Sequence, residues 1–251
     1  MVDSSILRDA ELFHGLDPDA LETIFKAGQI RRIKKRTRIF NQGAPAKSCH
    51  LLIEGRTKIV QSGPDGEQVL IHLVGPGEMY GIAAVFLRTG YPADAFAITD
   101  CTDLQWSART IKELMLSYPC IALNAINIIA TRYHDAQHRL REMAHQSVER
   151  RIAHAMLRLV QYAGRRVGNH IEIEVPLLRQ DMAELTGTSM FTVSRVLSDW
   201  ETKGIVDASR RRIVVRQLHA LVAIAERTGE LKSRPKLRVD YPNSDRKSTR
   251  L

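Results

Sequence analysis

The sequence predicts an α+β protein with an N-terminal antiparallel β-roll, a long helix and a C-terminal winged helix-turn-helix. Short segments rich in Val, Ile and Leu alternate with glycine turns between residues 30 and 106. An apolar stripe with heptad spacing follows Pro119, and a pattern of small, glycine and branched residues spans residues 179–200. The expected parts are the roll at 1–118, the long helix at 119–147, the winged domain at 148–227, and a basic, disordered tail at 228–251.

Length and composition narrow the class of protein. A chain of 251 residues with 44% hydrophobic and 26% charged residues has enough apolar material for one large or two modest domains. No apolar run reaches the length of a membrane span, and the charged N-terminus is unlike a secretory signal. The three cysteines are too scattered for a disulfide scaffold, a zinc site or an iron–sulfur cluster. We therefore expect a cytoplasmic protein without membrane contact.

The positive charge is concentrated in the C-terminal part of the chain. Residues 1–149 hold 17 basic and 17 acidic side chains, residues 150–227 hold 13 and 8, and residues 228–251 hold 7 and 3. The whole excess of +9 therefore lies beyond residue 149. This asymmetry indicates a neutral half for sensing or assembly and a half that faces nucleic acid, although a mild excess can also serve solubility alone.

The N-terminal half is expected to begin as helix and to continue as strands. Residues 1–30 are interpreted as helical, with Asp17-Pro18-Asp19 as a helix start. The strands that follow end at turn residues, and residues 63–66 are predicted to be a hairpin tip because their types favour turn dihedrals. Strands at this spacing are typical of a sandwich or closed roll.

A long helix is predicted after Pro119. Apolar residues recur there at alternating intervals of four and three, namely Ala122, Ile126, Ile129, Tyr133, Ala136, Leu140 and Met143. A helix packed on its own domain could also carry a stripe, but about 26 residues span about 39 Å at 1.5 Å per residue, which exceeds a small roll. We therefore predict a symmetric homodimer in which the residues from Ile126 to Met143 pack on a second copy.

A shorter helix is expected from Val148 to Ala163. Ser147 is its predicted N-cap and marks a hinge between the two halves. Residues 164–168 are expected to break this helix, and alternating residues at 171–175 predict a short strand. The winged motif then follows.

Residues 179–200 read RQDMAELTGTSMFTVSRVLSDW and have the pattern of a helix-turn-helix. Ala183 provides the small side chain needed where the second helix crosses the first, and Gly187 provides a left-handed turn. The inner anchors of the second helix are Val193, Val196 and Leu197. These offsets predict a recognition helix over residues 189–202, although an ordinary helical hairpin can match them by chance.

The exposed face of this helix provides the candidate DNA contacts. They are Thr188, Ser189, Met190, Phe191, Ser194 and Arg195, with Thr188 or Ser189 also capping the helix. Two short strands at 205–206 and 213–215 are expected to flank a basic wing tip. The candidates for phosphate contact are Arg179, Gln180, Arg210, Arg211 and Arg212. A solvated charged turn is the alternative interpretation of the tip.

Together these features resemble the CRP/FNR family of bacterial transcription regulators over roughly residues 10–225. The resemblance rests on the long striped helix, the winged motif, the segment Gly77-Glu78-Met79-Tyr80-Gly81 and the further roll glycines Gly43 and Gly55. It implies a cyclic-nucleotide-binding-like jelly roll that senses a signal, and a homodimer that binds double-stranded DNA at a palindromic promoter site. It also implies contact with RNA polymerase, for which residues 63–66 and 165–169 are the candidate surfaces.

The recognition helix keeps part of the family's Glu-x-x-Ser-Arg pattern. Arg195 stands where the family uses arginine against guanine, and Ser194 matches the serine. Phe191 replaces the Glu, and a phenyl ring cannot accept a hydrogen bond from a cytosine amino group. We therefore predict a half-site other than the TTGA type, with Phe191 either against a thymine methyl group or turned into the core.

The resemblance also narrows the set of possible effectors. Members that bind cyclic AMP carry a Glu after the second glycine and an Arg-Ser or Arg-Thr pair before the next strand, where this chain has Ile82 and Tyr91-Pro92. A buried cyclic phosphate would lack its counter-charge, so we predict no binding of cAMP. No cysteine precedes Cys49, which excludes the family's iron–sulfur sensors. The remaining resemblance is to the nitric-oxide-responsive Dnr/NnrR-type branch that controls denitrification genes, some members of which are thought to hold haem.

Several alternatives stay open. The regulator could use another small-molecule effector, or it could be controlled by its abundance or by oxidation of Cys49 or Cys101, although both also suit small buried positions. A haem would need an axial ligand, and the histidines in or near the roll are His14, His50 and His72. A strand histidine is most often structural, so we assign no haem or metal ligand.

An enzyme has little support in the sequence. It lacks a phosphate-binding glycine loop, a His-Glu-x-x-His motif and a Gly-x-Ser-x-Gly motif. Asp181 and Glu184 could imitate a catalytic carboxylate pair, but they are more simply the acidic charge at a helix N-terminus. We assign no catalytic residue.

Overall fold

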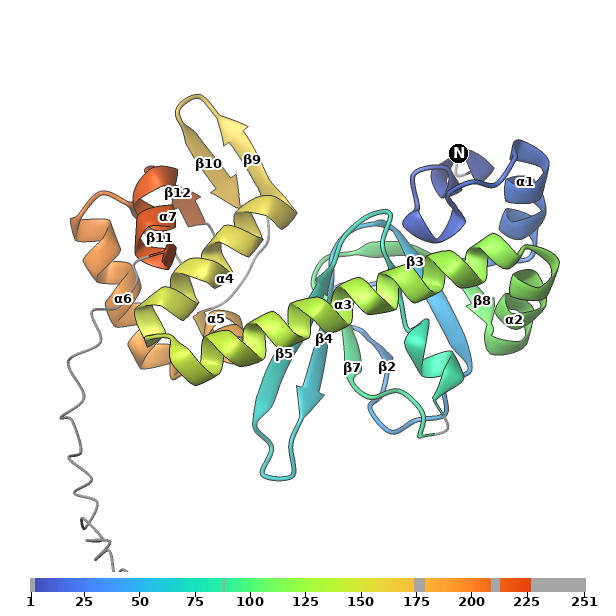
Figure 1. Cartoon of the computed structure of the whole chain (residues 1–251), viewed down its shortest axis with the longest axis horizontal. Helices are drawn as coiled ribbons and strands as arrows, with labels where there is room; N and C mark the ends of the chain where they lie inside the picture. The colour runs from blue at the N-terminus through green and yellow to red at the C-terminus, as the bar shows by residue number, and fades with distance from the viewer. Residues whose placement is uncertain (1–2, 88, 174–178, 209–212, 227–251) are drawn as a thin grey trace, which may run out of the picture.

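Two folded parts joined by one long helix make up the molecule (Figure 1). The computed structural model describes residues 3–87, 89–173, 179–208 and 213–226. Helix α3 (Pro119–His145) runs along an N-terminal antiparallel β-roll and ends beside a smaller C-terminal domain of helices and short strands. The predicted α+β class and the order of its elements are confirmed.

The N-terminal segment contains short helical turns where helix is expected throughout residues 1–30. Its elements are η1 (Ser4–Leu7), η2 (Glu11–Phe13) and α1 (Pro18–Lys26). Gly15 has φ +85° and interrupts the segment before α1, whose N-cap Asp17 accepts a hydrogen bond from the Ala20 N–H. Residues 29–33 pair with a strand, so the expectation of helix up to residue 30 is wrong at its end.

The roll consists of two four-stranded antiparallel sheets, ordered β1-β8-β3-β6 and β2-β7-β4-β5. The strands are β1 (Gln29–Ile33), β2 (Arg38–Phe40), β3 (Ser48–Glu54), β4 (Thr57–Ser62), β5 (Gln68–Val74), β6 (Met79–Tyr80), β7 (Asp94–Ala97) and β8 (Cys101–Ser107). The last β4–β5 pair is Ser62 with Gln68, so the predicted hairpin tip lies between these strands. Gly66 has φ +81° in this turn, a conformation that glycine adopts without steric cost.

The core of the roll continues into the helices at its end. Trp106 of β8 is fully buried, packs on Phe13 at a centroid distance of 5.4 Å, and donates its indole N–H to the Ile24 carbonyl at 2.9 Å. Two further helical elements adjoin the roll, η3 (Ala83–Phe86) and α2 (Ala108–Ser117). The roll therefore shares its apolar core with the N-terminal segment and with α2 and α3.

Helix α3 is attached to its own roll along one face only. Ile121, Ala125 and Ile128 are buried in the roll core. Further along, Arg132 donates to the carbonyl of Met79 and Arg139 donates to the carbonyl of Ile71. The predicted heptad stripe lies on a different face of the helix.

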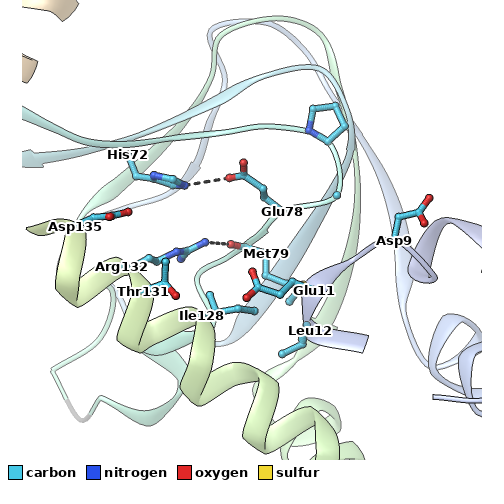
Figure 2. A pocket seen from close by; sticks show the side chains of 12 residues that line it. Asp9, Glu11, Leu12, His72, Glu78, Met79, Ile128, Thr131, Arg132 and Asp135 are labelled. Atoms are coloured by element: carbon cyan, nitrogen blue, oxygen red, sulfur yellow. Dashed lines mark hydrogen bonds and ion pairs between the residues drawn. The ribbon is translucent and has the colours of Figure 1, made fainter. Parts of the chain in front are cut away.

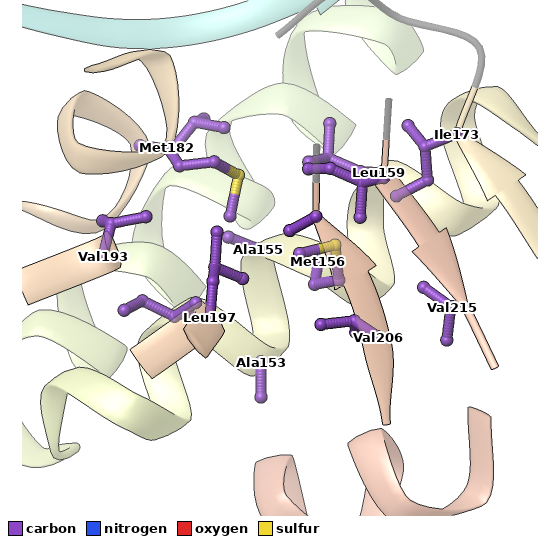
Figure 3. Packing of buried hydrophobic residues seen from close by; sticks show 14 of the residues in the cluster. Ala153, Ala155, Met156, Leu159, Ile173, Met182, Val193, Leu197, Val206 and Val215 are labelled. Carbon is purple, nitrogen blue, oxygen red and sulfur yellow. The ribbon is translucent and has the colours of Figure 1, made fainter. Parts of the chain in front are cut away.

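The C-terminal domain packs four helices around a four-stranded sheet ordered β11-β12-β10-β9. Its elements are α4 (Val148–Ala163), β9 (Gly164–Val167), β10 (His170–Ile173), α5 (Arg179–Thr186), α6 (Met190–Thr202), β11 (Val206–Ala208), β12 (Ile213–Val215) and α7 (Leu218–Glu226). Figure 3 shows its apolar interior, in which Met156, Met182 and Leu197 come together from three helices. The Ser147 side chain accepts a hydrogen bond from the Arg150 N–H, so its predicted role as N-cap is confirmed.

Helix α4 ends at Ala163, as predicted, but the stretch that follows is a strand and not a loop. Residues 164–167 form strand β9, in which Arg165 pairs with Glu172 and Arg166 pairs with Ile171 of β10. Gly168 has φ +57° and closes this hairpin. Backbone pairing with β10, which periodicity does not reveal, turns the expected loop into a strand.

Helix α5 joins the C-terminal domain to the roll. Residues 181–186 are all buried, and Leu70 and Leu73 of β5 belong to the same apolar cluster as Met182 of α5. The Lys58 Nζ of β4 lies 2.6 Å from Asp181 Oδ1. Asp181 lies in the first turn of α5, as predicted, and its carboxylate also forms a largely buried ion pair between the two parts, whereas Glu184 lies beyond that first turn.

Within the described ranges, no single helix is both long and apolar enough to cross a bilayer. Helices α2 and α3 meet the length and composition criteria only as a pair, and that pair is bent by 116°.

Candidate functional site

The turn between α5 and α6 has the backbone geometry of a helix-turn-helix. Gly187 has φ +58°, and the Thr188 N–H donates to the Ala183 carbonyl at 3.1 Å. Ser189 is the N-cap of α6, since its hydroxyl accepts a hydrogen bond from the Thr192 N–H at 3.1 Å. Of the two predicted caps, Ser189 takes this role.

The inner face of α6 is anchored as the pattern predicts. Val193 and Leu197 are buried, and Val196 is half-buried against the same cluster. The sequence reasoning missed Trp200, which is fully buried and donates its indole N–H to Glu149 Oε1 at 3.2 Å. Its spacing of seven residues from Val193, two helical turns, is the signal that could have identified it.

The outer face of α6 presents an apolar and a cationic group together. Phe191 is 77% exposed and Met190 is 53% exposed, and Arg195 is also exposed. Because its ring lies in solvent, Phe191 is not a core residue. Of the two positions predicted for it, the one inside the core is therefore wrong. The side of α6 that faces away from the core is therefore available to a partner.

The polar neighbours of α6 are less free than the sequence implies. The Arg179 guanidinium donates to Ser194 Oγ and to the Ala208 carbonyl, both at 3.3 Å. Gln180 donates to Glu184 Oε1 at 3.1 Å. The predicted wing arginines, Arg210, Arg211 and Arg212, lie outside the described residues.

The heptad stripe of α3 is unburied within one chain. Tyr133 is 64% exposed and Leu140 is 70% exposed, and the other members of the predicted set, Ile126, Ile129, Ala136 and Met143, are exposed too. A row of apolar side chains open to water is costly, at roughly 25 cal/mol per Å² of apolar surface. This face of α3 is therefore suited to burial against a partner.

A cavity of about 390 Å³ lies where the N-terminal segment, the turn before β6 and α3 meet (Figure 2). Its polar lining is mainly acidic, with Asp9, Glu11, Glu78 and Asp135. His72 Nε2 lies 3.1 Å from Glu78 Oε2, and burial lowers the pKa of Arg132. Arg132 of α3 donates to the Met79 carbonyl, so this charged group at the cavity attaches α3 to the roll.

The interior of the roll contains a buried polar and aromatic cluster, which we name the roll cluster. Its members are Phe40, Ser48, His50, Tyr80, Tyr91 and Asp103. His50 Nδ1 lies 2.9 Å from Asp103 Oδ2, and the Tyr80 hydroxyl donates to the same oxygen at 2.7 Å. Burial and the Asp103 carboxylate raise the pKa of Tyr80. The polar members of the cluster therefore form a buried hydrogen-bonded network, with the half-buried Phe40 beside it.

Comparison with known proteins adds to this geometry. Two protein-family models match the chain, the cyclic nucleotide-binding domain over residues 30–118 and the Crp-like helix-turn-helix domain over residues 150–224. The chain belongs to the CRP/FNR family of transcription regulators.

CRP/FNR relatives match almost along their whole length. The chain is 24% identical over 210 residues to a CRP-like cAMP-activated global transcriptional regulator of Mycobacterium tuberculosis, covering 84% of this chain and 94% of that protein. It is 27% identical over 219 residues to the cyclic AMP receptor protein of Thermus thermophilus, covering 87% and 98%. The solved structure of FixK2 from Bradyrhizobium japonicum is similar in fold, with a TM-score of 0.69, 20% identity, and coverage of 78% and 96%. The family and its curated relatives are transcription regulators and not enzymes.

A cyclic nucleotide, which this CRP/FNR roll implies, does not fit the residues present. Ile82 and Tyr91 are buried at the positions where the cAMP-binding members carry their polar ligands. The roll cluster contains one carboxylate, that of Asp103, and no arginine, so it offers no fixed counter-charge to a phosphate. The sequence-based prediction against cAMP thus agrees with the packing.

Haem does not fit the three candidate histidines either. Both ring nitrogens of His50 are engaged, with Ser48 Oγ at 3.1 Å and Asp103 at 2.9 Å. His72 is paired with Glu78 beside charged residues of α3, and His14 is exposed to solvent. An axial ligand needs a free nitrogen in an apolar pocket. Within the described part of the chain, no group of three or more His, Cys, Asp or Glu residues could hold a metal ion.

The cysteines of this regulator differ in accessibility. Cys49 and Cys101 are buried, and Cys120 is half-buried. Burial raises the pKa of the Cys49 thiol to about 12, so the reactive thiolate is suppressed at neutral pH. Cys49 is therefore poorly suited to act as an oxidation sensor.

Proposed function

We propose that this regulator acts as a homodimer whose paired α6 helices bind an inverted-repeat promoter site. The observation that carries the proposal is the exposed apolar stripe from Ile126 to Met143 on α3. It lies beside the face that holds the same helix to the roll through Ile121, Ala125 and Ile128, and its members Ala136, Leu140 and Met143 also line a pocket next to β5. A second copy of α3 would bury both stripes around a two-fold axis, which also produces two recognition helices for two half-sites.

Base reading is assigned to Arg195 and Phe191. The forked donors of Arg195 match the O6 and N7 acceptors of guanine, and the exposed Phe191 ring suits a thymine methyl group. Ser194 and Met190 lie on the same turn, and Thr188 and Ser189 precede it. Arg179, Gln180 and the arginines at 210–212 are the proposed phosphate contacts, which position the helix without reading sequence.

The test combines oligomeric state with site selection. Analytical ultracentrifugation should give a dimer, and selection from random duplexes should recover an inverted repeat with half-sites other than TTGA. Tyr133→Asp should yield monomers and weaken binding to the selected site by at least tenfold. A chain that sediments as a monomer under all conditions, or binds scrambled and inverted-repeat duplexes equally, would contradict the proposal.

Contact with RNA polymerase is proposed for two hairpin tips, the one at residues 63–66 and the one between β9 and β10. Both are turns between paired strands. Alanine substitutions there should lower reporter transcription while promoter occupancy, measured by footprinting, stays unchanged. A parallel loss of occupancy would argue against this role.

Control of denitrification genes in response to nitric oxide stays a prediction that rests on the family resemblance. Spectra of anaerobically purified protein, with and without added haem and nitric oxide, would test it directly. The alternative is a regulator whose roll needs no exchangeable effector. The buried hydrogen bonds of the roll cluster support this alternative.

A further inference from the structure

Tyr91 occupies the part of the roll where the family resemblance places ligand-binding residues. It lies just before β7 and is 4% exposed. A Cβ added to Gly81 would lie 3.4 Å from Cε1 of Tyr91 and 3.5 Å from Cε1 of Phe40. The rings of Tyr91 and Phe40 therefore border the space that a side chain at residue 81 would fill, which leaves little room there for a ligand.

The phenol ring of Tyr91 is held on its face and at its polar end. Phe40 stacks on it with a centroid distance of 3.9 Å and an interplanar angle of 8°. Its hydroxyl donates to the Ser48 carbonyl at 2.6 Å and accepts from the Ser48 N–H at 3.2 Å. The ring therefore has the stacking and hydrogen-bonding partners that a binding pocket provides for an aromatic ligand.

A chain of hydrogen bonds links Tyr91 to the centre of the opposite sheet. Ser48 Oγ lies 3.3 Å from the Tyr91 hydroxyl and 3.1 Å from His50 Nε2. His50 in turn contacts Asp103, which also accepts from Tyr80. Withdrawing Tyr91 would leave Ser48 groups unpaired in the interior, at a cost for each buried polar group.

We propose that Tyr91 is a built-in occupant of the part of the roll where the family resemblance places ligand-binding residues. Its side chain takes the place of an exchangeable ligand and excludes cyclic nucleotides. Its ring spans the two sheets through Phe40 of β2 and Ser48 of β3, and thus holds the roll in one closed arrangement. The proposal concerns the roll alone. It stands whether or not the chain dimerises or binds DNA.

The first test measures ligand binding by the full-length protein. Isothermal titration with cAMP and with cGMP should give no saturable heat for the wild type or for Tyr91→Phe, which keeps the ring. Saturable micromolar binding of either nucleotide to the wild type would overturn the proposal. This test does not require any destabilised variant to fold.

The second test opens the pocket and refills it with p-cresol, which is the side chain of tyrosine as a free molecule. Tyr91→Ala should lower Tm by roughly 6–20 °C, since a large buried side chain is lost in a chain of this size. Saturating p-cresol should recover several degrees of this loss and leave the Tm of Tyr91→Phe unchanged, because an apolar-walled cavity binds a matching small molecule.

Tyr118→Ala is the matched control for the second test. Tyr118 is a partly buried tyrosine outside the roll cluster. Its variant should lose stability without rescue by p-cresol. Equal rescue of Tyr118→Ala, or no rescue of a folded Tyr91→Ala, would count against a built-in occupant. If Tyr91→Ala does not fold, Tyr91→Leu provides the same cavity test with a smaller void.

Discussion

Helices α5 and α6 are neighbours in one motif, yet their environments are opposite. Six consecutive residues of α5, from Asp181 to Thr186, are buried between the roll and the rest of the C-terminal domain. Helix α6 buries one face only and leaves Met190, Phe191 and Arg195 exposed. The difference indicates that α5 attaches the motif to the body of the protein, whereas α6 is available to recognise a partner.

A matched pair of methionines gives the largest expected contrast. Met182 of α5 is 1% exposed and Met190 of α6 is 53% exposed. Met182→Ala should lower the free energy of unfolding by about 2–5 kcal/mol, since it leaves a cavity. Met190→Ala should change it by less than about 0.5 kcal/mol. Equal losses in urea unfolding experiments would remove the distinction between the two helices.

The next effect concerns the ion pair that attaches α5 to the roll. Lys58 and Asp181 are 25% and 8% exposed, so Lys58→Met removes the Lys58 cation from beside a mostly buried carboxylate. We expect a loss of about 1–3 kcal/mol, less than for a fully buried pair because Lys58 is partly solvated. Calorimetry should then show separate unfolding of the roll and the C-terminal domain.

The charge-reversed double variant, Lys58→Asp with Asp181→Lys, provides the control for this pair. It should restore a single unfolding transition if the attraction between the two charges couples the parts. A double variant as unstable as the sum of its single variants would show that packing alone joins α5 to the roll.

On α6 the expected effect is on DNA and not on stability. Arg195→Ala should cost about 1–3 kcal/mol of binding to the preferred duplex and relax preference at one base position. Its Tm should stay within a degree or two of the wild type, because the side chain is exposed. Fluorescence anisotropy with single-base variants of the site measures the effect, and Ser198→Ala, also exposed on α6, is the control. If the base preference is unchanged in Arg195→Ala, a residue other than Arg195 recognises that base.

The smallest expected effect is on the pH dependence of cysteine reactivity, since the cysteines also differ in burial. Because the pKa of Cys49 is raised from 9.0 to about 12 in the folded protein, its thiol should resist iodoacetamide up to pH 9, whereas the half-buried Cys120 reacts first. Because the pKa of Cys49 is higher in the folded than in the unfolded protein, protonation of this thiol favours the folded state. Its contribution to stability is therefore present below pH 9 and is lost as the pH rises from 9 toward 12. Mass spectrometry of the iodoacetamide-labelled peptides checks the order in which these cysteines react.

Local patterns were sufficient for the elements whose residues interact with near neighbours. The α5–α6 turn follows from Gly187, which tolerates a positive φ, and from Ser189, whose hydroxyl caps the next turn. The β4–β5 hairpin follows from turn residues, and α4 follows from its cap at Ser147. Contacts over long sequence separations were not predictable in this way. The strand at residues 164–167 depends on pairing with β10, and periodicity carries no information on that partner.

The sequence by itself determined that this chain is a two-part α+β regulator with a striped helix and a helix-turn-helix, because periodicity and turn chemistry are local properties. Tertiary structure alone decided which groups meet across the chain. It brought Tyr91 onto Gly81 and Ser48, placed Asp181 against Lys58, and left Phe191 in solvent. Burial is a property of the whole fold, since the same carboxylate or phenol can be a surface group or an internal partner depending on what the chain places beside it.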